Sequence, residues 1–286
     1  MSDFLIHYES WVRLSVFFGV FAVMASWELL APRRQLTVGK AGRWASNIGI
    51  VVLNTVLLRL LFPAAAVGMA LAAEQGGWGL LNHYAVPPLL AFAGSVVLLD
   101  FAIYMQHVMF HAVPALWRLH RVHHADLDFD VTTGARFHPL EIILSMLIKF
   151  AVIAVLGPPA AAVVAFEIVL NATAMFNHSN ARLPLVIDRL LRMVVVTPDM
   201  HRVHHSIEDD ETNSNFGFNL PWWDRLFGTY RAQPRGGHEG MIIGIRTFRD
   251  PRQCDRLSAM LWLPFAAPVT EYAINRRQWG GKDERS

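Results

Sequence analysis

Five long apolar runs constrain this chain of 286 residues more than any other feature. They lie near 14–31, 45–68, 87–108, 140–157 and 159–177. A helix needs about 20 residues to cross the hydrocarbon of a bilayer. Charged residues make up 17% of the chain, whereas roughly 25% is usual in a soluble domain. We therefore predict an all-α integral membrane helical bundle, forming a single membrane domain over residues 1–286 with N-terminal spans within 14–68.

The distribution of positive charge indicates the orientation of these runs. Four basic residues lie between the first and second runs, namely Arg33, Arg34, Lys40 and Arg43. The connection 74–86 contains no Lys or Arg. Cytoplasmic loops of membrane proteins carry the excess of Lys and Arg, so we expect the first loop on the cytoplasmic side. The third run then returns to the cytoplasm near His111.

Later segments differ in composition from the runs. Gly157-Pro158-Pro159 predicts a tight helical hairpin between the fourth and fifth runs. Residues 178–255 are more polar and predict a cytoplasmic helical cap. The short apolar segment 257–272 contains two prolines, which favours an interfacial helix over a span. No basic region or cleavage site of a signal peptide follows Met1, so insertion is expected to use the internal runs.

Ionisable residues inside apolar runs are costly and are usually paired or functional. A hairpin at Gly157 would bring Lys149 and Glu167 to a similar depth, which predicts a buried ion pair. Arg59 and Asp100 are a second predicted pair, between the second and third runs.

Histidines are arranged in a repeated pattern. The pentapeptide His-Arg-Val-His-His occurs at 120–124 and again at 201–205, and His107 and His111 precede the first copy. Positions i, i+3 and i+4 of a helix share one face, so each copy can direct three imidazoles at one point. Zinc takes about four ligands and an octahedral ion about six, so these histidines predict a dimetal centre. The eight predicted ligands are His107, His111, His120, His123, His124, His201, His204 and His205.

Further residues lie at the same predicted membrane level. His178, at the inner end of the fifth run, is a ninth predicted ligand. His138 is either a tenth ligand or a helix-entry residue. His7, His83 and His238 fall outside the pattern and are expected to be bystanders. The residues expected to support the ligands are Asp100, Tyr104, Asp199 and Asn213, with Asp100 a possible acceptor for an imidazole N–H.

Composition restricts the ligand chemistry and the partners. The formal net charge of +2 is small and the basic residues are scattered, which argues against nucleic acid as a partner. Cys254 is the only cysteine, so nitrogen must hold the metals. Imidazole suits zinc, copper and iron. Redox-active iron is favoured because a long apolar substrate can reach a centre beneath the spans directly from the bilayer, and its C–H bonds offer nothing to a hydrolytic zinc.

These histidine motifs resemble the fatty acid hydroxylase superfamily, which includes sterol desaturases and other membrane-bound histidine-motif di-iron oxygenases. The likeness extends to His138-Pro139 with Glu141, Asn177-His178-Ser179-Asn180 and Trp223-Asp224-Arg225-Leu226-Phe227-Gly228, and it places a catalytic region within 87–232. It implies two iron ions, with zinc possible in a structure, O2 as co-substrate and a lipid or sterol substrate from the bilayer. The chain has no fused cytochrome b5-like domain, so the resemblance implies a separate electron donor, a reductase with a ferredoxin or cytochrome.

The predicted function is therefore O2-dependent hydroxylation of an alkyl C–H bond in a lipid by a multi-pass membrane protein, with its metal site on the cytoplasmic side. Desaturation on the same centre remains an alternative. A membrane zinc hydrolase is disfavoured because the chain contains no His-Glu-x-x-His motif. A haem-binding or metal-binding membrane protein without oxygenase activity is the alternative from another class.

Overall fold

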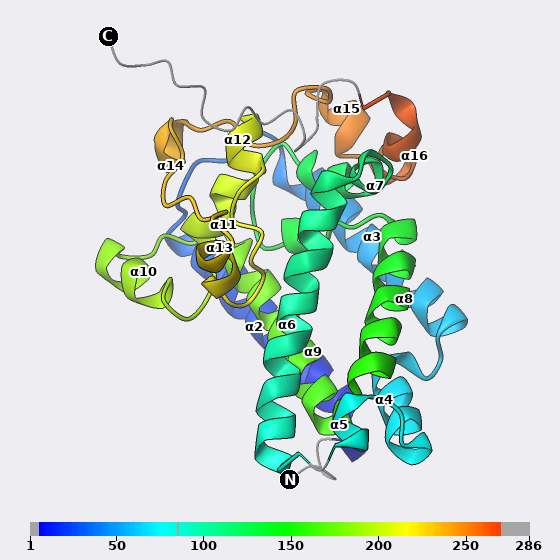
Figure 1. The fold of residues 1–286 in the computed structure, drawn as a ribbon. Coiled ribbons are helices and arrows are strands. Elements are labelled where there is room, and N and C mark those ends of the chain that lie inside the picture. Colours follow the sequence, from blue (N-terminus) through cyan, green and yellow to red (C-terminus); the bar gives the residue numbers. More distant parts are fainter. Residues whose placement is uncertain (1–5, 85, 270–286) are drawn as a thin grey trace.

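The structure, a computed structural model, describes residues 6–84 and 86–269, and within these ranges it contains helices and isolated bridges but no strand. Five helices are long and apolar enough to cross a membrane, in agreement with the five predicted runs. They begin and end as follows: α2 Glu9–Leu30, α3 Lys40–Leu61 (continued by shorter helices to His83), α6 Pro88–Ala112, α8 Pro139–Leu156 and α9 Ala160–Asn177. Figure 1 shows them as an inclined bundle that carries the shorter helices.

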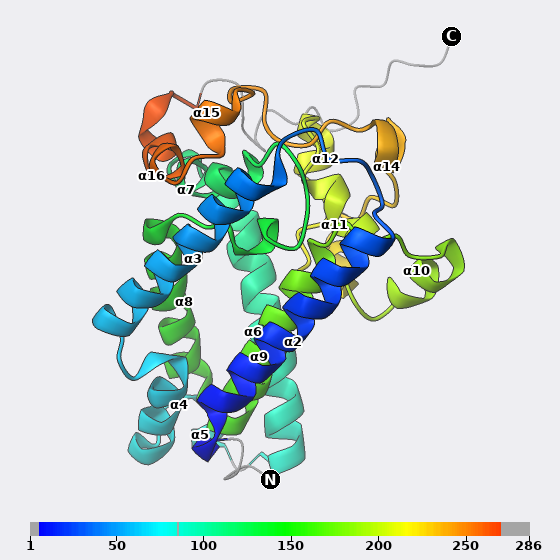
Figure 2. The ribbon, with the colours of Figure 1, turned by 180° about the vertical axis from the view of Figure 1, so that it is seen from behind.

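The remaining helices are short. Near the spans lie α4 Ala65–Gly76, α5 Leu80–His83 and α7 Pro114–His124, followed by the 3₁₀ helix η1 Thr133–Ala135. The later segments form α10 Leu185–Leu191, α11 Pro198–His204, α12 Asp209–Thr212, α13 Trp222–Leu226, α14 Gly237–Gly240, α15 Pro251–Cys254 and α16 Leu257–Ala266. The cap elements α11, α12, α14, α15 and α16 lie at one end of the bundle, and α5 lies at the other (Figures 1 and 2). The predicted helical cap is therefore present.

The second predicted run, 45–68, is not one continuous helix. Helix α3 ends at Leu61, because Phe62 precedes Pro63 and adopts a non-helical conformation. Ala65 then has a positive φ of 50°, and the chain reverses into α4. Helix α4 packs against α8 and α9 at the end of the bundle opposite the cap.

The hairpin between α8 and α9 confirms one predicted ion pair. Gly157 has φ +63°, and a Cβ there would lie 2.4 Å from the carbonyl oxygen of Trp78, so only glycine fits. The turn brings Lys149 Nζ to 2.7 Å from Glu167 Oε1. Arg13 of α2 reaches Glu167 Oε2 at 2.8 Å, which ties three spanning helices together.

The predicted pair of Arg59 and Asp100 is wrong. Asp100 accepts hydrogen bonds from the Trp223 indole, at 2.7 Å, and from the Asn219 backbone N–H, at 3.3 Å. Arg59 is exposed near the end of α3. The loops of the cap fold back onto α6 and satisfy Asp100, a contact that spacing along the spans does not reveal.

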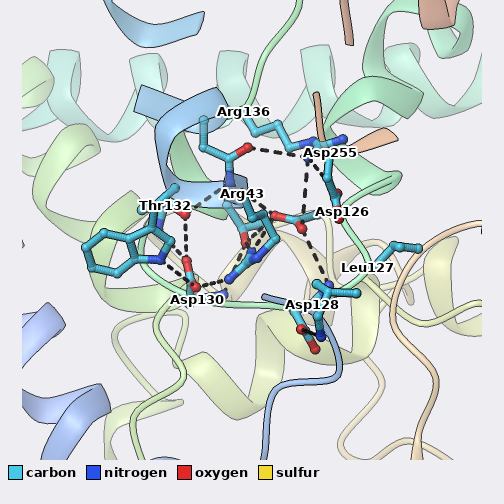
Figure 3. Close-up of polar contacts among 12 residues, drawn as sticks. Arg43, Asp126, Leu127, Asp128, Asp130, Thr132, Arg136 and Asp255 are labelled. Carbon is cyan, nitrogen blue, oxygen red and sulfur yellow. Dashed lines mark hydrogen bonds and ion pairs between the residues drawn. The ribbon is translucent and has the colours of Figure 1, made fainter. Parts of the chain in front are cut away.

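A buried network of arginines and aspartates holds the loop 125–136 that follows α7 (Figure 3). Arg43 of α3 contacts Asp126, at 2.9 Å, and also Asp130. Arg136 donates to the Val122 carbonyl at 2.7 Å. We call Arg43, Asp126, Asp130 and Arg136 the loop clamp. Removing one partner of a buried ion pair costs about 3–5 kcal/mol because the other charge stays buried, so the loop clamp fixes α7 relative to α3.

Candidate metal centre

Four helices deliver nine histidines to one region where the spans meet the cap. His107 and His111 lie in the last turns of α6, and the first pentapeptide forms the end of α7. The second pentapeptide ends α11, with His205 as its C-cap, and His178 is the C-cap of α9. Both pentapeptide helices begin with a proline, Pro114 and Pro198. Proline at this position is preorganised for a helix start, which sets where each short helix begins.

The nine rings form two groups. Within each group, one ring nitrogen of every member lies within 4.8 Å of those of the other members. The first group contains His107, His111, His120, His124 and His204. The second group contains His123, His178, His201 and His205. Every one of these residues is at most 8% exposed.

Each pentapeptide contributes to both groups, contrary to the expectation that its three rings share one point. The i, i+4 pair of the first copy, His120 and His124, belongs to the first group, while His123 belongs to the second. In the second copy the i, i+4 pair, His201 and His205, belongs to the second group, and His204 crosses to the first. Each group therefore takes rings from both pentapeptide helices, α7 and α11.

Two rings of the first group, His107 and His204, are oriented as metal ligands require. Nδ1 of His107 donates to the Phe216 carbonyl and Nδ1 of His204 to the Ser214 carbonyl, each at 2.8 Å. Nε2 of both rings is buried and has no hydrogen-bond partner. A second-sphere acceptor on one nitrogen fixes the tautomer that leaves the other lone pair free for a metal. A buried polar atom without a partner would otherwise be costly, so this arrangement fits bound cations.

In the second group, three rings face each other through their Nε2 atoms. Nε2 of His178 lies 3.2 Å from Nε2 of His123 and 3.0 Å from Nε2 of His201. Nδ1 of His178 donates to the Ala174 carbonyl at 2.8 Å, so its Nε2 carries no proton. A cation between these three Nε2 atoms would have one nitrogen from each ring within reach.

Burial keeps these histidines neutral. It lowers the pKa of His120 and of His178 to about 3, so both rings are unprotonated near neutral pH. Nδ1 of His120 lies 2.6 Å from Glu141 Oε1, which forms a carboxylate–histidine pair at the first group. The sequence motif His138-Pro139-x-Glu141 marked this carboxylate, but its contact with His120 depends on the packing of α7 against α8.

The structure does not place His138 in either group. Its Nδ1 accepts the backbone N–H of Leu140 at 3.2 Å, and its Nε2 donates to the Leu261 carbonyl at 3.3 Å. Both ring nitrogens are thus engaged, as the helix-entry alternative requires. His7, His83 and His238 also lie outside both groups.

Four residues were expected to support the ligands. One of them, Asn213, contacts a histidine of the two groups in the described part of the chain. The side chain of Asn213 hydrogen-bonds to His111. Asp100 instead contacts Trp223, and Tyr104 contacts the Thr229 hydroxyl at 3.1 Å. Asp199 binds Arg33 and Arg202. The acceptors for the ring N–H groups are mainly backbone carbonyls, which residue type alone cannot identify.

Comparisons with known proteins support the same region as the functional one. The family described as Fatty acid hydroxylase matches residues 92–229, a segment that contains all nine histidines. Ornithine lipid hydroxylase OlsE of Rhizobium tropici is 27% identical over 228 residues, 77% of this chain and 67% of that protein. Alkylglycerol monooxygenase of Homo sapiens is 32% identical over 152 residues, 52% of this chain and 32% of that protein. The chain thus spans about a third of the human relative. No solved structure gives a significant match.

Proposed function

This chain belongs to the fatty acid hydroxylase superfamily, as its histidine pattern predicted, and on that premise we propose that it hydroxylates an alkyl C–H bond of a lipid. The proposed enzyme is a di-iron oxygenase that uses O2 and electrons from a separate donor, a reductase with a ferredoxin or cytochrome. Its similarity to proteins named ornithine lipid hydroxylase and alkylglycerol monooxygenase supports a lipid substrate.

The observation that carries this proposal is the pair of buried histidine groups with ring nitrogens free of protein partners. The first group of five would hold one ion and the second group of four the other. Imidazole ligands suit iron and zinc alike, and iron supplies the chemistry needed to activate O2 toward an alkyl C–H bond. Neutral ligands leave the positive charge of the ions largely uncompensated, and a bound cation would favour the ionised form of Glu141 beside His120.

The surrounding residues exclude water and orient the rings. Phe137 stacks on His123 with ring centroids 4.4 Å apart, and Phe129 lies 5.0 Å from His205. Trp117 covers His111 at 4.9 Å. This apolar wall favours an alkyl chain over a polar substrate. The centre lies at the cap ends of α6 and α9, so we expect a lipid to approach it from the bilayer.

We assign the catalytic unit to residues 87–232, with N-terminal spans within 14–68 and an interfacial helix within 257–272. Helix α16 covers Leu257–Ala266, with Trp262 and Phe265 exposed, and residues 270–272 lie outside the described ranges. We place the cap and the metal centre on the cytoplasmic side, since the loop with Arg33 and Arg34 lies at the cap end.

Desaturation is the alternative reaction at the same centre. The position of the substrate carbon decides between hydroxylation and desaturation. A bis-histidine haem, by contrast, needs one ring from each of two helices, whereas nine rings gather here. This ligand number disfavours a simple electron carrier.

Comparison of lipid extracts from cells with and without the gene tests the proposal. We expect a lipid that differs by one added oxygen, and a loss of two hydrogens would indicate desaturation instead. Metal analysis of iron-supplied protein should approach two irons per chain. Unchanged lipids together with one iron or none would contradict the proposal.

A further inference from the structure

A lateral patch of apolar side chains is exposed on α10 and directly after it. It comprises Leu185, Val186, Ile187, Leu190, Met193 and Val194, which are 47–68% exposed. Helix α10 protrudes sideways from the bundle in both opposite views (Figures 1 and 2). Large contiguous apolar surfaces on a protein mark contacts with other proteins or with membranes. This patch plays no part in the metal centre, so it requires another explanation.

The lateral patch continues onto a membrane-spanning helix through α13. The Trp222 indole donates to the Met193 carbonyl at 2.7 Å, which joins α13 to the patch. Phe227, itself half exposed, lies with its ring centroid 5.9 Å from that of Phe101 and 5.6 Å from that of Tyr104, both on α6. Trp222 and Phe227 thus connect the patch to α6.

A second connection leads to α2. The backbone N–H of Arg182, just before α10, donates to the Ala31 carbonyl at the end of α2. The neighbouring face of α2 has an open apolar hollow of about 600 Å³, lined by residues that include Val23, Trp27 and Leu30. The patch is therefore attached at the level where two spanning helices, α2 and α6, meet the cap.

The charges around the lateral patch are positive. Arg182, Arg189 and Arg225 are exposed beside it. The two acidic residues of these segments, Asp188 and Asp224, are buried. Asp188 pairs with Arg192 at 2.7 Å, and Asp224 accepts the backbone N–H groups of Phe216 and Gly217. An apolar face with a cationic rim matches the boundary between acyl chains and anionic headgroups.

From the exposure, the connection to α6 and the cationic rim, we propose that the lateral patch is inserted in the bilayer, at the boundary between the acyl chains and the headgroups on the cap side. Exposed tryptophan at α13 suits the same boundary, where its ring packs in apolar surroundings and its edge stays polar. Helix α10 then holds the cap against the membrane surface, next to α6, the helix that also carries His107 and His111. This placement depends on neither metal loading nor activity.

Fluorescence quenching in nanodiscs that contain one copy of the full chain tests this inference. Val186→Cys and Leu190→Cys would each carry an environment-sensitive fluorophore in anionic discs doped with phosphatidylcholine spin-labelled near the top of its acyl chain. The parent protein measures background labelling, which should be low because Cys254 is buried and burial raises its pKa to about 12. Leu147→Cys, exposed on the spanning helix α8, is the control within the membrane, and Arg252→Cys, exposed on α15, is the control in water.

We expect the labels at 186 and 190 to be quenched and blue-shifted like the label at 147. Labels that behave like the one at 252 would overturn the inference. They would point instead to a protein partner or a second copy as the natural cover of the patch, since neither is present in a disc with one copy.

Discussion

His123 and His204 occupy position i+3 of the two pentapeptides. Each belongs to a different histidine group from the i, i+4 pair of its own helix. Each lies in the group to which the other copy supplies its i, i+4 pair. Loss of either ring would thus remove a ligand from one metal and leave the pair of the same helix in place. These two positions are the most direct test of the ligand assignment.

His123→Ala and His204→Ala should each abolish turnover and reduce bound iron, because a neutral buried nitrogen cannot be replaced by water without loss of geometry. His83→Ala is the matched control, since His83 lies on α5 at the far end of the bundle. Activity and iron content measured together would check this. Equal losses in all three variants would contradict the assignment.

Glu141→Gln keeps an oxygen that can accept the Nδ1–H of His120 but removes the charge beside the first group. Changes to such second-sphere partners typically reduce metal affinity by about 10–100-fold, and we expect a loss in that range. Iron competition with a chelator would measure it. Glu74→Gln, on the exposed surface of α4, is the control, and equal affinity in both variants would argue against a role for the Glu141 charge.

His238 predicts a pH dependence of stability outside the metal groups. Burial lowers its pKa from 6.5 to about 3, and its Nε2 lies 3.5 Å from Asp199 Oδ2. Below the unfolded pKa the unfolded chain takes up a proton that the folded protein does not. Stability from this residue is therefore fully present above pH 6.5 and is lost, by up to about 1.4 kcal/mol per pH unit, as the pH falls toward 3.

Thermal denaturation of the wild type and His238→Gln in detergent checks this expectation. The nine histidines of the two groups are present in both proteins, so the difference in melting temperature isolates His238. The wild type should lose more stability than the variant between about pH 7 and about pH 5. Parallel curves would show that His238 does not carry this dependence.

At the scale of elements, the arginine within each pentapeptide anchors its helix to a distant segment. Arg121 of α7 donates to the carbonyls of Leu263 and Ala267 at the end of α16, at 2.7 and 2.9 Å. Arg202 of α11 donates to the Ser179 carbonyl, next to His178 of the second histidine group. The repeated arginine therefore has a structural role in both copies, but with different partners.

Arg121→Gln should loosen α16 while leaving iron content nearly unchanged. Hydrogen bonds to a charged group contribute about 1.5–3 kcal/mol each, so amide exchange within α16 should become much faster. Hydrogen exchange with mass spectrometry over 257–266 measures the effect. Arg252→Gln, exposed on α15, is the control. Slow exchange in the Arg121 variant would mean that packing alone holds α16.

At the scale of the whole molecule, the loop between α2 and α3 lies at the same end of the bundle as the cap elements (Figure 2). Arg33 of this loop contacts Asp199 of α11, the helix that carries the second pentapeptide, at 3.1 Å. That end is cytoplasmic if the positive-inside bias determines the orientation. Reporter fusions within 110–135 and 200–230 should both report the cytoplasm, and fusions within 74–86 should report the opposite side. An external position of either cap segment would reverse the proposed topology.

The sequence by itself predicted the helical membrane class, the number of candidate spans and the nine histidines that the structure brings together. These features depend on local hydrophobicity, composition and spacing, which act over a few helical turns. The Lys149–Glu167 pair was predictable for the same reason, because a single tight turn at Gly157 sets the depth of both residues.

Only the tertiary structure decided how the nine rings divide into groups of five and four, which carbonyls orient them, and that His138 caps a helix. It also decided that Asp100 meets Trp223 rather than Arg59. Each of these depends on packing between segments far apart in the chain, where small rotations of a helix exchange one partner for another. The sequence shows which residues can make such contacts. It does not show the helix rotations that decide which partner each residue meets.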